Sequence, residues 1–168
     1  MAHIEEFSAL TPPVGIESKY MRARPAAPAN AVLDLDTPDE LAIRSLILGI
    51  VHRTIGDYVT GRALLNDALK HGPNVETSTW VSAVAYFELA VLEMKAGEQK
   101  AAERETDSEE TADGMVEWMD TFKAARAMLA EATSNCTREV DLSSRLDSRI
   151  VMLKEEIKKK MEMVGCEE

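Results

Sequence analysis

The chain has 168 residues, with 19 Lys and Arg against 30 Asp and Glu, a formal net charge of −11, and 45% hydrophobic but only 5% aromatic residues. This length fits one domain with a hydrophobic core of its own. The negative charge, and the lack of a basic stripe interleaved with aromatics, argue against binding to nucleic acid or to an anionic membrane surface.

The two cysteines, Cys136 and Cys166, are too few for a disulfide framework, which favours free thiols in a reducing compartment. The N-terminal residues MAHIEEFSALTPP lack the basic start and apolar stretch of a signal peptide. The longest apolar windows, 46–51 and 83–92, are much shorter than the roughly 20 residues that cross a bilayer. We therefore expect a cytoplasmic protein with no transmembrane segment.

Two regions differ in pattern. Residues 1–37 are rich in Pro and Ala without a helical period and predict a flexible arm, whereas residues 38–165 predict a helical domain. A helix should begin at Pro38, because Thr37 and Glu40 have the spacing of a capping box. Apolar residues surround this helix almost completely, which predicts a central position in the fold. They are Leu41, Ile43, Leu46, Ile47, Leu48, Ile50, Val51 and Ile55.

Helical patterns continue along the chain, and none alternates like a strand for long, so we predict an all-α fold of about five helices. Gly56–Asp57 should end the first helix and cap a second, which His71–Gly72–Pro73 stops. A third helix is predicted over about 78–96, with Gly97 as its C-terminal cap.

A strongly acidic segment follows. Residues 103–120 hold eight acids and one base, so we expect an acidic insert here in the form of a solvated loop or a frayed helix. The helical pattern returns at Phe122, and a last helix should begin near Asp141. That helix has one apolar stripe with steps of three and four residues, made by Leu142, Leu146, Ile150, Leu153, Ile157, Met161 and Val164.

The chain also contains an internal repeat. Residues 48–73 place Leu, Gly, Ala and Pro at the spacings of a tetratricopeptide repeat, in which small side chains let two helices cross closely. In a second copy, helix B is best matched by Ala125, Leu129 and Ala132; alternatively it begins at Ala101–Ala102 and the acidic insert splits it. The predicted repeat-packing residues are Gly49, Gly61, Ala68, Ala90, Ala125 and Ala132.

Residues 41–157 resemble the C-terminal repeat region of the tetratricopeptide repeat protein 39 and inclusion body clearance protein family. The resemblance lies in LGIVHRTIGDY, in W-x-x-A-x-A-Y-F-E-L-A-V-L and in the SSRLDSRI of the closing helix. Members of that family are several times longer, so the chain is a C-terminal fragment, a truncated gene product or a degenerate relative. The resemblance implies tetratricopeptide-like hairpins, a part in clearing protein inclusions, and a cytosolic, nuclear or mitochondrial outer-surface location.

No motif predicts catalysis. The histidines His3, His52 and His71 lack partners at metal-ligand spacing and favour structural roles, and Cys136 has no activating base nearby in sequence. Four acids of the insert could hold a divalent cation, although they lack the order of an EF-hand loop. They are Asp107, Glu109, Glu110 and Asp113. We expect no enzyme, no cofactor and no metal site.

Functionally, we predict a protein-interaction scaffold or adaptor. The positions that line the groove of a tetratricopeptide domain are apolar here, so the groove cannot clamp a carboxylate and must be covered. The last helix, a missing N-terminal region or another protein could cover it. The groove positions are Ile43, Leu46, Ile50, Val84, Phe87 and Val91. The sequence does not name the partner, and we expect a monomer or a weak homodimer. The alternative function is a small regulatory module whose acidic insert binds a divalent metal or a basic protein.

Overall fold

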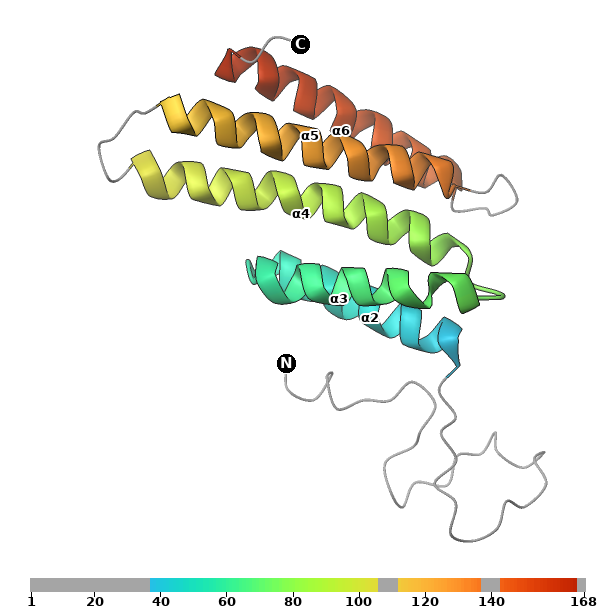
Figure 1. The fold of residues 1–168 in the computed structure, drawn as a ribbon. Coiled ribbons are helices and arrows are strands. Elements are labelled where there is room, and N and C mark those ends of the chain that lie inside the picture. The colour runs from blue at the N-terminus through green and yellow to red at the C-terminus, as the bar shows by residue number, and fades with distance from the viewer. Residues whose placement is uncertain (1–36, 106–111, 137–142, 166–168) are drawn as a thin grey trace, which may run out of the picture.

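The structure, a computed structural model, describes residues 37–105, 112–136 and 143–165. These residues form α-helices and one short 3₁₀ turn, and none of them lies in a strand, so the all-α prediction is confirmed (Figure 1). The elements are α2 (Pro38–Thr54), α3 (Tyr58–His71), η2 (Gly72–Asn74), α4 (Trp80–Glu105), α5 (Ala112–Ser134) and α6 (Ser143–Val164). The predicted arm, apart from its last residue Thr37, and His3 within it lie outside the described residues.

The start of α2 is the predicted capping box. The backbone N–H of Thr37 donates to Glu40 Oε2 at 3.0 Å, and the backbone N–H of Glu40 donates to Thr37 Oγ1 at 3.4 Å. Each side chain thus satisfies an N–H group that the first helical turn leaves free. Pro38, the first helical residue, needs no such partner because it has no N–H.

The turn between α2 and α3 also follows the prediction. Gly56 has φ +85°, a conformation that side chains disfavour, and it directly follows the last turn of α2. Asp57 then caps α3, because its Oδ1 accepts from the backbone N–H of Thr60 at 3.1 Å. The two helices therefore form a hairpin with a short connection.

The helices of this hairpin cross at two glycines. A Cβ at Gly49 would lie 2.7 Å from Cγ of Leu65, and one at Gly61 would lie 3.0 Å from the backbone nitrogen of Arg53. The first distance is shorter than real Cβ atoms show, and the second is at the tight limit of real Cβ contacts. The close packing expected of these small residues is therefore present between α2 and α3.

Asp39 joins the start of α2 to the segment before α4. Its carboxylate accepts from the backbone N–H groups of Glu76, Thr77 and Ser78, the first two at 3.0 Å. These hydrogen bonds favour the ionised form, so they lower the pKa of Asp39, the bond from Glu76 having the largest effect. The carboxylate thereby fixes the loop that positions α4 against the hairpin.

We predict that this contact makes stability depend on pH in the acidic range. A carboxyl group whose pKa is lowered by folding stabilises the fold above its ordinary pKa of 3.8, and that stabilisation is lost as the pH falls through the folded-state pKa. Asp39→Asn should therefore melt below the wild type at pH 7, and the difference should shrink toward about pH 3. Thermal melts at both values check this, with the exposed Asp120→Asn as control; a difference that is the same at both would contradict it.

Two predictions about the next segment are wrong. Gly97 does not cap a helix, because α4 continues through it to Glu105. The reason is tertiary packing: a Cβ at Gly97 would lie 2.9 Å from Cγ2 of Thr121 and 3.3 Å from the ring of Trp118, so the glycine lets α5 approach α4. The alternative in which helix B begins at Ala101–Ala102 is also wrong, because both residues belong to α4.

The described parts of the acidic insert predicted over residues 103–120 are helical, where the sequence predicts a solvated loop or a frayed helix. Residues 103–105 end α4 and residues 112–120 begin α5, while 106–111 lie outside the described residues. Glu117 on α5 pairs with Lys100 and Arg104 on α4, and the hydrogen bond from Lys100 is the main reason that the pKa of Glu117 is lowered. Stacking of Trp118 on Phe122, with ring centroids 5.2 Å apart, adds apolar packing where charge alone predicts none.

The hydrophobic core lies on two sides of α4. One cluster joins α4 to α2 and α3 and includes Leu46, Leu65 and Leu89. The other joins α4 to α5 and α6 and includes Phe87 and Phe122. The stripe predicted for the last helix is confirmed for its described core members, which are buried in this second cluster: Leu146, Ile150, Leu153, Ile157 and Met161. Val164 packs at its edge, and Leu142 lies outside the described residues.

Candidate functional site

The structure places the six predicted groove residues in two environments. Leu46 and Phe87 are core residues, 2% and 3% exposed. Ile43 and Ile50 on α2, with Val84 and Val91 on α4, are partly buried and pack at the edges of the two clusters. Protein binding by these six positions stays a prediction.

The repeat-packing residues all lie at contacts between helices. Gly49, Gly61 and Ala68 are buried between α2, α3 and α4, and Ala90, Ala125 and Ala132 are buried in the cluster of α4, α5 and α6. The four alanines are 0% exposed. Small side chains therefore lie at the contacts between these helices, and their role in repeat packing stays a prediction.

A buried carboxylate lies between α2 and α6. Glu88, on α4, is 2% exposed, and its Oε2 lies 2.8 Å from Nη2 of Arg53 on α2. Its Oε1 accepts a hydrogen bond of 3.1 Å from Nη2 of Arg149 on α6. One anion thus holds two cations from helices that do not follow one another in the chain, so α2 and α6 both flank α4 at Glu88.

This ion-pair cluster is not among the features predicted from the sequence, although the sequence contains a signal for it. Glu88 is the one charged residue in the apolar window 83–92. A carboxylate buried without partners costs several kcal/mol, so such a residue predicts cationic partners elsewhere in the chain. The identity of those partners, 35 positions before and 61 after Glu88, is set by the tertiary fold.

The arginine from α6 also covers a predicted groove residue. The guanidinium carbon of Arg149 lies 4.3 Å from the centre of the Phe87 ring, within the range of a cation–π contact. Farther along the two helices, Lys160 of α6 pairs with Glu98 of α4. The last helix therefore covers Phe87 through apolar and ionic contacts, as one of the three predicted covers would.

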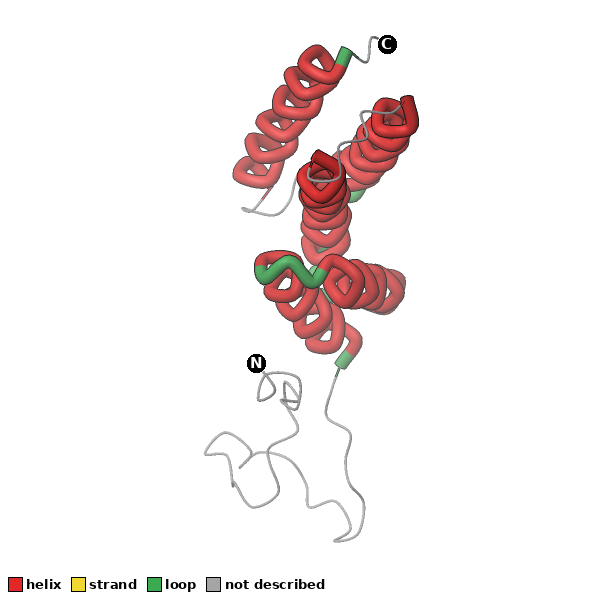
Figure 2. Tube along the Cα trace, turned by 90° about the vertical axis from the view of Figure 1, so that its left-hand side faces the viewer, coloured by secondary structure: helices red, strands yellow, loops and turns green. Residues whose placement is uncertain are grey.

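Figure 2, turned by 90° from Figure 1, shows α6 at the left and α5 at the right, both above α4. Since Glu88 contacts both α2 and α6, both helices border the surface of α4 that carries Glu88. We call the exposed surface around the Arg53–Glu88–Arg149 cluster the α2–α6 face. On α2 it carries the stripe Ile43, Ile47 and Ile50, of which Ile47 is 52% exposed.

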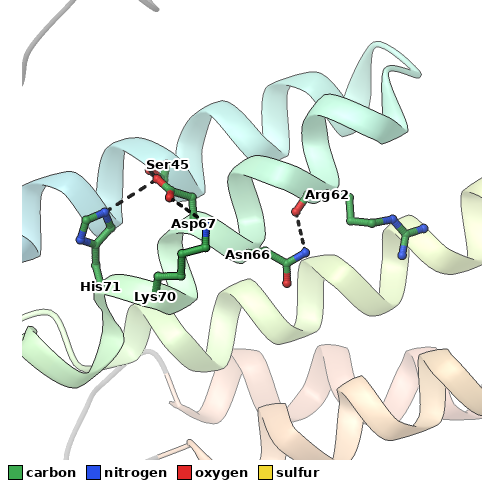
Figure 3. Close-up of polar contacts among 6 residues, drawn as sticks. All are labelled: Ser45, Arg62, Asn66, Asp67, Lys70 and His71. Atoms are coloured by element: carbon green, nitrogen blue, oxygen red, sulfur yellow. Dashed lines mark hydrogen bonds and ion pairs between the residues drawn. The ribbon is translucent and has the colours of Figure 1, made fainter.

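A second polar cluster lies within the hairpin (Figure 3). Asp67 on α3 accepts a hydrogen bond of 3.0 Å from the buried hydroxyl of Ser45 on α2. Lys70 Nζ lies 3.5 Å from the same carboxylate and His71 Nε2 lies 3.7 Å from it. Because Asp67 satisfies a buried hydroxyl and two neighbouring side chains of its own helix, this cluster stabilises the hairpin.

The described histidines take part in similar local contacts. Nδ1 of His52, at the end of α2, lies 3.0 Å from Oδ2 of Asp57, the residue that caps α3. Within residues 37–105, 112–136 and 143–165 no group of three His, Cys, Asp or Glu is arranged to hold a metal ion. Three of the four insert acids named above lie outside these residues: Asp107, Glu109 and Glu110. Asp113 lies in α5, but its side chain is not described.

Cys136 follows α5 and is partly buried. Burial, and next the neighbouring carboxylate of Asp147 on α6, raise the pKa of its thiol. Both effects disfavour the thiolate, which is the reactive form of cysteine.

We therefore predict slow alkylation of Cys136 in the folded chain. In a Cys166→Ser background, iodoacetamide at neutral pH should modify Cys136 more slowly than it modifies the same chain in urea, and Asp147→Asn should raise the folded-state rate. Mass spectrometry of timed samples measures both rates. Equal rates for the folded and unfolded chains would contradict the assigned role of burial.

Searches of protein-family models, curated proteins and solved structures find no match to this sequence. Among the described residues, the helices lack the combination of length and apolar character needed to cross a membrane.

Proposed function

We propose that the chain is a non-enzymatic helical-repeat scaffold or adaptor that binds another protein through the α2–α6 face. In this proposal α2–α3 and α4–α5 are two tetratricopeptide-like hairpins and α6 is their C-terminal cap. The packing of α2 and α3 against one part of α4, and of α5 and α6 against another, supports it, as do the small residues at the helix contacts. The observation that carries it is Ile47, an isoleucine half exposed beside the partly buried Ile43 and Ile50.

The remaining parts of the proposal rest on the sequence. A part in inclusion clearance, and placement in the cytoplasm, the nucleus or at the mitochondrial outer surface, come from the resemblance to the inclusion body clearance family. The proposal assigns no catalysis, because no pair of titratable residues has the spacing of a shared active site.

Two exposed apolar residues allow a matched test. Ile47→Asp should abolish capture of the partner while leaving helicity intact, because the side chain is 52% exposed. The control is Val59→Asp on α3, which introduces the same charge at a residue that is 84% exposed and away from the face. Affinity capture followed by mass spectrometry, with circular dichroism of each variant, makes the comparison. Capture that Ile47→Asp and Val59→Asp change equally would contradict the proposal.

The double change Ile50→Asp with Phe87→Asp is not a clean test. Phe87 is 3% exposed and packs under Arg149, so a charge there should unfold the cluster of α4, α5 and α6. We expect this variant to lose helicity. Ile47 is the sharper probe because the core does not need it.

A further inference from the structure

On the α2–α6 face, the acidic and basic side chains of an ion pair differ in how exposed they are. The side chain of Glu88 is 3% exposed, whereas that of Arg149, which pairs with it, is 53% exposed. At the second ion pair, Glu98 is 32% exposed and Lys95, whose Nζ lies 2.8 Å from it, is 49% exposed. At Glu88 the anion lies beneath Arg149, so a molecule approaching this part of the face meets positive charge first. At the other end Lys160, 24% exposed, lies deeper than its partners Glu98 and Glu156.

The charged residues of this face also sum to a positive charge. One stripe of α6 runs through Arg145, Arg149, Met152, Glu156 and Lys160, and its contacts with Glu88 and Glu98 turn it toward α4. Together with Arg53 and Lys95, five cations stand on the face against the carboxylates of Glu88, Glu98 and Glu156. Near the start of α2, Arg44 adds one positive charge, and Glu40 and Asp39, which is four residues before Ile43, add two negative charges. The face is thus positive on a chain whose formal charge is −11.

We propose that the α2–α6 face binds an amphipathic segment of another protein in which apolar side chains are flanked by carboxylates. Its apolar side lies on Ile43, Ile47 and Ile50, which span about 10 Å of α2, or two helical turns. Its carboxylates lie toward α6, where Arg145 is exposed and Arg149 is half exposed. The inference rests on the proposed function and adds the chemistry of the partner to it.

Charge complementarity favours this partner over a second copy of the chain. A second copy would bring a strongly negative protein with its own positive face, and two such faces would repel each other in a symmetric dimer. An acidic segment instead meets Arg145, which is exposed, and Arg149, whose counter-ion Glu88 is buried beneath it. Buried Glu88 keeps Arg53 and Arg149 in place but does not screen the outer side of Arg149.

The experiment uses a phage-displayed library of random peptides of about 15 residues, long enough for four helical turns. The full chain is the bait, and phage that also bind Ile47→Asp are removed. Peptides that survive are synthesised, and their affinities for each variant are measured by fluorescence anisotropy. Arg145→Glu reverses a charge on the face, and Lys158→Glu reverses one on the opposite, exposed side of α6. Arg145 is chosen over Arg149 because Glu88 does not depend on it.

We expect the surviving peptides to have apolar residues at helical spacing, with Asp or Glu at positions between them. Ile47→Asp should weaken their binding at least about tenfold, as for a central interface residue. Arg145→Glu should weaken it about threefold, Lys158→Glu should change it little, and raising NaCl from about 50 to about 500 mM should weaken it further. Peptides that depend on Ile47 but show neither acidic residues nor sensitivity to Arg145→Glu would overturn the inference and leave the proposed function standing. Failure to recover any peptide that distinguishes the chain from Ile47→Asp would overturn both.

Discussion

Glu88→Ala should destabilise the fold by about 3 kcal/mol, because it removes the shared partner of two arginines. Most of this cost comes from Arg53, whose side chain is 17% exposed and would keep a charge that water reaches poorly. Arg149, 53% exposed, can turn to solvent. Urea denaturation followed by circular dichroism measures the loss, and the exposed Glu155→Gln on α6, which should change the free energy of unfolding by less than about 0.5 kcal/mol, is its control.

A compensating pair separates the cost of the orphaned charge from the loss of volume. Glu88→Leu combined with Arg53→Met replaces the buried pair by apolar side chains of similar size, which is often neutral or stabilising. We expect this double variant to recover most of the stability that Glu88→Ala loses. If Glu88→Ala unfolds at the same urea concentration as the wild type, the cluster contributes no more than a surface ion pair.

Loss of Glu88 should also affect the α2–α6 face, because this carboxylate holds cations from both of its edges. The consequence links packing to the proposed function: a variant that keeps its helices but frees Arg53 and Arg149 no longer fixes α2 and α6 relative to each other. Binding by the face should then weaken even though neither the Ile47 stripe nor Arg145 has changed.

Local signals predicted the parts of the fold that depend on neighbours in sequence. The capping box of Thr37 and Glu40 and the turn at Gly56–Asp57 need contacts over only a few residues, and both are present. The stripe of α6 follows from a spacing of three and four residues, whose core members Leu146 to Met161 are buried. Short-range hydrogen bonding and helical geometry are enough to fix these features.

The errors arise where a distant part of the chain decides the local structure. Gly97 predicts a helix end, but α4 continues beyond it because Thr121 and Trp118 pack where its side chain would be. The acidic segment predicts a solvated loop or a frayed helix, but in its described part Lys100 and Arg104 pair with Glu117 across the α4–α5 contact. In both cases tertiary packing outweighs a local preference of about 1 kcal/mol.

The candidate site divides in the same way. The apolar character of Ile43 and Ile50 could be read from helical periodicity, but the burial of Leu46 and Phe87 depends on how α3 and α6 cover them. Exposure of Ile47 could not be predicted, because apolar residues surround α2 on nearly every side. What distinguishes the α2–α6 face is therefore the arrangement of the helices around α4.

Gly61→Val should be as damaging as the loss of Glu88, costing about 3 kcal/mol, because the added methyl groups would meet backbone and not a side chain that can turn away. A Cβ at Gly61 already lies 3.0 Å from the nitrogen of Arg53 and 3.2 Å from the carbonyl oxygen of Gly49. To admit valine, α2 and α3 must separate, which would open the packing around Leu65. Urea denaturation of the variant measures the cost.

Two further substitutions in α3 distinguish crowding from helix propensity. Ala63→Val introduces the same side chain at an exposed position two residues away and should cost only about 0.5 kcal/mol. Gly61→Ala gains about 1 kcal/mol of propensity and loses a similar amount to the close contact with α2, so we expect little net change. If Gly61→Val costs no more than Ala63→Val, the crossing of α2 and α3 has room for a side chain, and the requirement for a small residue at this repeat position is wrong.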